Sequence, residues 1–119
     1  FLFMSSHNLL SIDRLLEVGL SLNLITMARN IVRYILLKLL NKNFSDLKKK
    51  EYAIINDGAH QFRLSTYYIK PLDQIKQLEK IGFKNVRSYS LDIGKEIPKS
   101  ELAITKDGLY HGLYYLCSI

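Results

Sequence analysis

The chain is poor in the residues that cross-link or interrupt small proteins. It has one cysteine, Cys117, and therefore no internal disulfide, which argues against a small secreted scaffold and makes the reducing cytoplasm the expected compartment. Only six glycines and two prolines occur in 119 residues, and 48% of the residues are apolar, which excludes disordered and collagen-like chains. We expect one globular domain.

The sequence also lacks a long apolar run and a leader. Arg29, Arg33 and Lys38 interrupt its most apolar region, so no uncharged stretch of about 18 residues is available to span a bilayer. No basic segment precedes an apolar run with a small-residue cleavage site, which argues against a signal peptide. The sequence opens with Phe1 inside a strand-forming run, and we therefore expect a piece of a longer protein.

Extended and helical patterns alternate along the chain, which indicates an α/β protein. Ser11 and Ser21 are expected to cap the first two helices, and Pro71 and Gly82 to begin and end the third. The patterns predict strands over 1–5, 51–58, 64–70, 85–91 and 113–118, helices over 11–19, 22–40 and 71–82, and polar connections over 41–50 and 92–111.

Short sequence motifs in the second half of the chain resemble those of a known protein family. The word Tyr-Tyr-Ile-Lys-Pro at 67–71 is followed by Gly82-Phe83, Asn85-Val86 and the word Tyr-Tyr-Leu-Cys at 114–117. In this order they resemble the carboxyl-terminal half of a class I methyltransferase that uses S-adenosylmethionine. In that family, a fifth strand similar to residues 1–8 precedes a helical or lid region, a helix that ends in a Gly-Phe word, and a final antiparallel pair of strands.

The resemblance implies an α/β fold containing a partial Rossmann-like methyltransferase sheet. Its last three strands, with an antiparallel final pair, would be accompanied by a helical lid region. The whole chain would form a single partial domain: a central strand and loop at 1–8, a helical lid region at 9–50, an extended pair at 51–70, and a helix with the final two strands at 71–119.

The donor site of that family is missing from this sequence. The family holds its donor over a glycine-rich turn after the first strand, with an acidic residue after the second strand on the ribose. The six glycines of this chain are isolated and build no such turn. We therefore expect S-adenosylmethionine for the full-length enzyme and neither a cofactor nor a metal for this chain alone. The implied function is the substrate-side portion of a methyltransferase, active only if an N-terminal half is supplied.

The alternative is a non-catalytic module, derived from that fold, that dimerises or binds a partner. In the full fold, the strand at 1–4 would pair with a strand from the other half of the sheet. In this chain it would present an open apolar edge and an uncovered sheet face, which favours a homodimer.

His7 and Asn8 are the first candidate site residues. They lie just beyond the carboxyl end of the first strand, where α/β folds bind ligands. His7 is a candidate general base on a small-molecule methyl acceptor, and Asn8 a candidate hydrogen-bonding partner of that acceptor. A capped loop explains the two residues equally well.

Tyr67 and His60 are further candidates for acceptor binding. Tyr67 and Tyr68 point to opposite faces of an extended segment, so at most one lines a pocket, and core packing accounts for either. His60 follows Asp57 by three residues, a spacing that fits an acid–base pair, two metal ligands, or a turn with a surface histidine.

The net charge of +6 raises the question of an anionic partner. The lysine run at 48–50, with Lys42 nearby, is of the kind that attracts phosphate-rich partners or anionic membranes. Most such runs are solvated surface, and the eight tyrosines are not interleaved with arginines. Neither nucleic acid nor a membrane is therefore the expected partner.

Overall fold

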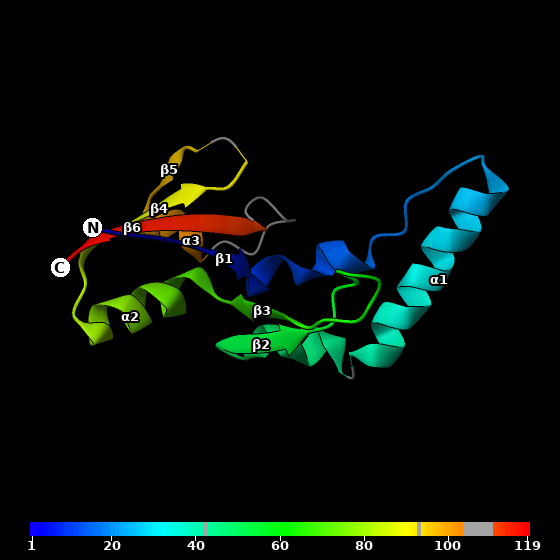
Figure 1. Ribbon diagram of the computed structural model, residues 1–119, viewed down its shortest axis with the longest axis horizontal. Coiled ribbons are helices and arrows are strands. Elements are labelled where there is room, and N and C mark those ends of the chain that lie inside the picture. The colour runs from blue at the N-terminus through cyan, green and yellow to red at the C-terminus, as the bar shows by residue number, and fades with distance from the viewer. Residues whose placement is uncertain (42, 93, 104–110) are drawn as a thin grey trace.

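The computed structural model describes residues 1–41, 43–92, 94–103 and 111–119 (Figure 1). The strands are β1 Leu2–Asn8, β2 Tyr52–Ile55, β3 Thr66–Ile69, β4 Lys84–Ser90, β5 Glu96–Ile97 and β6 Gly112–Ser118. The α-helices are α1 Leu24–Leu40, α2 Pro71–Ile81 and α3 Lys99–Leu102, and the 3-10 helices are η1 Leu9–Leu16 and η2 Phe44–Lys49.

The strands form one open, mixed sheet in the order β2-β3-β1-β6-β4-β5, so the chain is an α/β protein. β6 lies between β1 and β4 and runs antiparallel to both. β3 runs parallel to β1 and antiparallel to β2. The predicted antiparallel pairing of the last two long strands is thus confirmed, and the two ends of the chain are paired with each other from Leu2–Cys117 to His7–Gly112.

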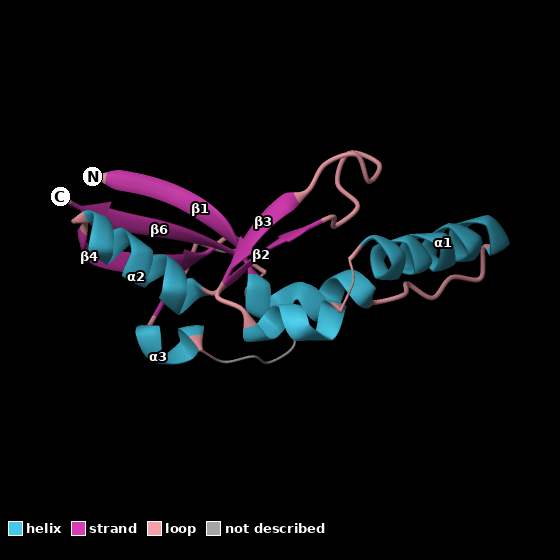
Figure 2. Ribbon diagram, turned by 90° about the horizontal axis from the view of Figure 1, so that it is seen from below, coloured by secondary structure: helices cyan, strands magenta, loops and turns pink. Residues whose placement is uncertain are grey.

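Helix α2 covers one face of β1, β6 and β4 (Figure 2). It begins at Pro71, whose ring suits the first helical turn, and ends at Gly82, whose φ of 119° strongly favours glycine. Both predicted ends of this helix are therefore confirmed. The first hydrophobic cluster joins the helix to alternate residues of β6 and to α3, and it comprises Ile75, Leu78, Ile97, Leu102, Leu113, Tyr115 and Cys117.

The opposite face of the same strands carries no helix among the described residues (Figure 2). Ser5, Tyr114 and Tyr89 are paired across three strands and so share this face with Phe3. Phe3 is 61% exposed, and its ring stacks on Tyr114 with the ring centroids 5.0 Å apart. β1 pairs with β3 only near its carboxyl end, so residues 2–6 pair with β6 alone within the described part of the chain.

A second hydrophobic cluster lies at the other end of the sheet. The two 3-10 helices pack there against one face of β2 and β3, and both contribute buried apolar residues. The cluster comprises Leu9, Ile12, Phe44, Ala53, Ile55 and Tyr68, with Leu15, Leu16 and Leu47 packed against it.

Helix α1 projects from the rest of the molecule (Figure 1). The radius of gyration is 15.9 Å, whereas a compact chain of this length has about 13.5 Å. The principal extents of 52 × 27 × 24 Å reflect the same elongation. Within the described residues, no helix is both long enough and apolar enough to cross a membrane.

The structure corrects the predicted capping residues of the first two helices. Asn8, not Ser11, caps η1, because its Oδ1 accepts a hydrogen bond from the Leu10 N–H at 2.9 Å. The 3-10 turn starts early because it buries Leu9 and Ile12, whose spacing of three residues matches that helix type. Asn23, not Ser21, caps α1.

Two segments predicted as polar connections also contain regular structure. Residues 41–50 include η2, because Phe44 is buried in the second cluster despite its lysine-rich surroundings. Residues 92–111 include β5 and α3, which bury Ile97 and Leu102. Such short elements give too few residues for a periodic pattern. Residues 93 and 104–110 of that prediction lie outside the described residues.

Candidate functional site

A pocket of about 330 Å³ opens where β1 and β3 end side by side. Because the two strands are parallel, their carboxyl ends meet at this edge of the sheet, which is the edge where α/β folds bind ligands. The pocket is lined by His7 of β1, Tyr68 of β3, Ser11, Arg14 and Leu15 of η1, and by Glu17 and His111. His7 therefore lines a pocket, but it lies within β1, which continues to Asn8, and not in a loop beyond the strand as predicted.

His7 and Tyr68 are neighbours in the lining of this pocket. They are paired across the two parallel strands, and their rings lie with centroids 5.0 Å apart at 35°. Tyr68 is buried by the second hydrophobic cluster, whereas His7 stays exposed. The imidazole of His7 is accordingly accessible to a molecule in the pocket, and one side of it lies against the Tyr68 ring.

Asp57, in the loop after β2, anchors the Tyr68 hydroxyl. The Tyr68 hydroxyl donates to Asp57 Oδ2 at 2.8 Å, and the Ala59 N–H donates to Oδ1 at 3.0 Å. Burial raises the pKa of Asp57, but these hydrogen bonds, one from Thr66 and the charge of His7 outweigh burial, so the pKa is lowered from 3.8. Burial and the Asp57 carboxylate raise the pKa of Tyr68. At neutral pH the pair is a carboxylate and a protonated phenol.

Arg14 and His111 also line the pocket and contact each other. Arg14 Nη1 lies 3.0 Å from His111 Nδ1, and arginine has only donors, so Nδ1 accepts this hydrogen bond. The neutral ring then carries its proton on Nε2, which lies 3.7 Å from Asp92 Oδ1. The contact holds a permanent cation beside the pocket, and a guanidinium suits an anionic or carbonyl group of a ligand.

The arrangement offers acid–base and anion-binding chemistry. An accessible imidazole can accept a proton from a bound hydroxyl, amine or thiol, and Arg14 can orient a negative group on the same molecule. The described residues contain no cluster of three or more histidine, cysteine or acidic side chains that could hold a metal ion.

Asn8 has a structural role in this arrangement. It is buried, its side chain caps η1, and its backbone N–H donates to the His111 carbonyl at 2.8 Å. The Ser11 hydroxyl donates to the Asn8 carbonyl at 2.9 Å. Asn8 does not line the pocket, so of the two interpretations of this residue the capped loop agrees with the geometry.

The structure does not bring Tyr67 or His60 to the pocket. Tyr67 points to the other face of β3, is 42% exposed, and has its ring 5.6 Å from that of Tyr52. His60 is exposed, with a left-handed backbone φ of 52°, in the connection between β2 and β3. Of the helical lid region predicted over 9–50, η1 lines the pocket whereas α1 projects away from it.

Sequence reasoning missed Arg14, His111 and the role of Asp57. Arg14 and His111 are separated by 97 residues, and only the pairing of β6 with β1 brings them together. The one available signal for Asp57 was its place in the turn after a strand, and that signal did not identify Tyr68 as its partner.

With the geometry in hand, comparison with known proteins adds no assignment: no protein-family model, no curated protein and no solved structure matches the chain.

The first prediction concerns the hydrogen bond between Tyr68 and Asp57. Replacing the tyrosine (Tyr68→Phe) should lower the free energy of unfolding by about 1 kcal/mol at neutral pH, because a partly buried carboxylate loses a donor. The pKa of Asp57 should rise toward 3.8. In the wild type, the lowered pKa of Asp57 stabilises the folded state above about pH 4. This stabilisation disappears as the pH falls through the folded-state pKa of Asp57.

Urea unfolding at neutral pH and in acid measures both effects. The variant should lose less stability than the wild type on acidification. Tyr67→Phe is the matched control, since that ring is exposed on the other face of β3, and its effect should stay within about 0.5 kcal/mol. Equal losses in the two variants would contradict the assigned hydrogen bond.

Proposed function

We propose that this chain is the carboxyl-terminal, acceptor-binding portion of a class I methyltransferase that uses S-adenosylmethionine. The observation that supports the proposal best is the pairing of β6 with both β1 and β4, because the resemblance implies a final antiparallel pair beside the strand at 1–8. The order of a first strand, a helical region, a helix ending at Gly82-Phe83 and two antiparallel strands also agrees.

The residues of this chain do not fit the methyl donor. Its six glycines are isolated in the sequence and build no glycine-rich turn. The donor, when bound by the complete enzyme, supplies an electrophilic methyl group. The described residues act on the acceptor, and residues outside this sequence bind the donor.

The pocket beside His7 binds the acceptor in this proposal. Methyl transfer requires mainly that the nucleophilic atom be oriented and that water be excluded. If the nucleophile carries a proton, His7 accepts it, and the neutral imidazole becomes an imidazolium beside the Asp57 carboxylate. Arg14, which lines the same pocket, positions a negative or carbonyl group of the acceptor.

A calorimetric titration with S-adenosylhomocysteine tests the placement of the donor site. We expect no saturable binding by this chain, because it lacks the donor loop, and clear binding by the longer product of the source gene that includes the upstream codons. Binding by this chain alone would show that the donor site is misplaced. Absence of binding by both proteins would refute the methyltransferase proposal.

The role of His7 is tested in the same longer product. Replacing it (His7→Ala) should lower kcat by about 100-fold or more when the acceptor must lose a proton, and leave the affinity for S-adenosylhomocysteine unchanged. The control is His60→Ala, which removes an exposed histidine outside the pocket and should leave kcat unchanged. An unaltered kcat in the His7 variant would exclude it as the base.

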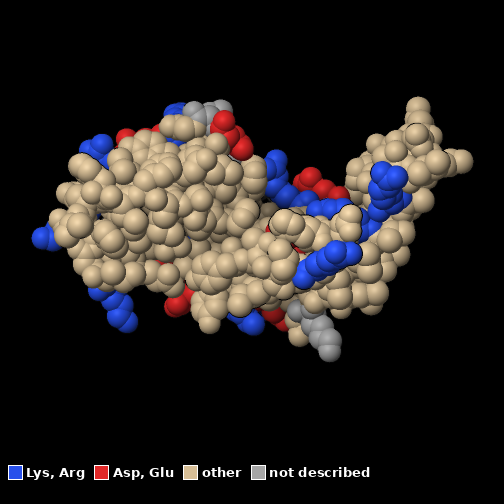
Figure 3. All heavy atoms as spheres, viewed as in Figure 1, with Lys and Arg blue, Asp and Glu red and all other residues tan. Residues whose placement is uncertain are grey.

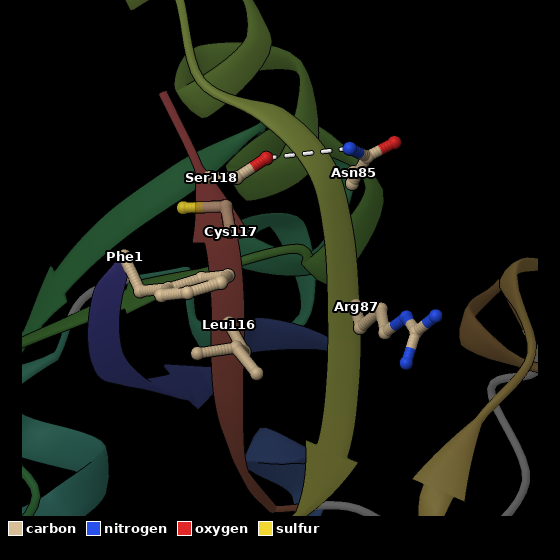
Figure 4. A pocket seen from close by; sticks show the side chains of 6 residues that line it. All are labelled: Phe1, Asn85, Arg87, Leu116, Cys117 and Ser118. Carbon is tan, nitrogen blue, oxygen red and sulfur yellow. Dashed lines mark hydrogen bonds between the residues drawn. The ribbon is translucent and has the colours of Figure 1, made fainter.

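The face of β1, β6 and β4 opposite α2, which no described helix covers, favours a second candidate function, self-association. On that face the Phe1 ring lies across β6 beside Leu116, at a hollow of about 270 Å³ that Arg87 and Ser118 also line (Figure 4). Residues 2–6 of β1 pair with β6 alone within the described part of the chain. An exposed strand edge next to exposed aromatic rings is a template for a second copy.

Sedimentation velocity tests this candidate. If the face is a dimer interface, the wild type should sediment as a dimer, and Phe3→Glu should sediment as a monomer because a charge replaces a 61%-exposed ring on that face. Leu64→Glu, in the loop before β3, is the control and should remain dimeric. A wild-type protein that is monomeric at high concentration would exclude self-association through this face.

A further inference from the structure

Helix α1 contacts the rest of the molecule through its polar side. Asn30 Nδ2 donates to the Gly19 carbonyl at 2.7 Å, and Arg33 Nη1 donates to the Leu15 carbonyl at 3.1 Å. Leu37 is the one buried residue of the helix. An amphipathic helix of a globular protein normally turns its apolar side inward, and here the polar side faces inward.

The apolar side of α1 faces outward as a continuous stripe. At about 100° per residue, six exposed apolar residues of the helix fall within a sector of roughly 120°, and Leu40, at the end of the helix, is exposed outside that sector. Leu20 and Leu22, just before the helix, are exposed as well. The outer stripe of α1 consists of Leu24, Ile25, Ile31, Val32, Ile35 and Leu39.

The charges around the outer stripe are all positive. Arg29 and Lys38 lie at its two borders on the helical projection, and α1 contains no acidic residue. Residues 18–45 likewise contain no Asp or Glu. Figure 3 shows Lys and Arg atoms on the side of α1 toward the body, and no Asp or Glu atoms on its projecting end.

A second copy of the chain is a poor occupant for this stripe. Two α1 helices packed together would bring four or more cations close with no acidic side chain between them, and like charges oppose such an interface. The helix is only about 25 Å long and 10 Å wide, so its face falls well short of the roughly 800 Å² per partner of a stable complex.

An anionic bilayer surface fits both properties. It accepts an apolar helix face of any outline, and its headgroups compensate the flanking cations. We propose that α1 is an interfacial membrane-binding helix, which lies in the plane of a bilayer containing anionic phospholipids with the outer stripe in the acyl boundary and Arg29 and Lys38 at the headgroups. From the sequence alone a membrane was not the expected partner, because most lysine-rich runs are solvated surface.

Vesicle flotation tests the proposal with this chain. We expect binding to vesicles of phosphatidylcholine mixed with phosphatidylserine, weaker binding to phosphatidylcholine alone, and a decrease with added salt. The double substitution Ile35→Glu with Leu39→Glu should weaken binding at least about tenfold. The control, Leu64→Glu with Ile81→Glu, makes the same change at exposed sites outside the stripe and should stay within about twofold of the wild type.

A spectroscopic measurement locates the stripe independently. The sequence has no tryptophan, so a single substituted tryptophan is the only indole that emits. Ile25→Trp in the stripe should shift its emission to the blue on adding anionic vesicles, and Ile81→Trp should not, although the two parent residues are 71% and 73% exposed.

Three results would overturn the proposal. Absence of binding to anionic vesicles is the first, and an equal loss of binding in the stripe and control variants is the second. The third is a wild-type dimer that Ile35→Glu with Leu39→Glu dissociates while vesicles stay unbound, because a second copy would then cover the stripe. Circular dichroism of every variant establishes that the fold is retained.

Discussion

The two antiparallel ladders of β6 are the interaction on which the rest of the structure depends. They join the first strand of the chain to the last and connect β4 to the centre of the sheet. The same strand provides Leu113, Tyr115 and Cys117, against which α2 packs. Burial raises the pKa of Tyr115 to about 12, so its phenol stays neutral inside the sheet through the physiological range. Since these contacts span almost the whole sequence, they form only after a large loop closes.

The pocket lies where β1 is paired on both sides, at His7. His7 is paired with Gly112 of β6 on one side and with Tyr68 of β3 on the other. A side chain at Gly112 would approach Leu91 to 2.8 Å, so glycine permits the close packing on the β6 side. On the other side, η1 turns directly out of β1 at the Asn8 cap and brings Arg14 over the strand ends. Of the residues that line the pocket, His7 and Tyr68 thus lie on the sheet, whereas Arg14 lies on η1.

The sequence contains strong local signals for some elements and almost none for others. Helix α2 was predictable at both ends, because Pro71 and Gly82 have conformational preferences that act locally. His7 was predicted in a loop beyond a strand over 1–5, whereas β1 continues to Asn8 and includes His7, because His7 and Asn8 pair with β3. The orientation of α1 was not predictable, since periodicity shows which residues share a face and not what that face contacts. Contacts such as Arg14 with His111 depend on strand order, which no short-range pattern encodes.

Arg33 has a mechanical consequence for the pocket. Its guanidinium bonds the Leu15 carbonyl, beside the pocket, and reaches the Asp57 carbonyl at 3.5 Å, in the turn that holds the Tyr68 hydroxyl. A displacement of α1 must therefore either break these bonds or carry both backbone segments with it. If a ligand of the helix and a ligand of the pocket each bind more tightly to one position of Arg33, thermodynamic linkage requires that each change the affinity of the other by the same factor.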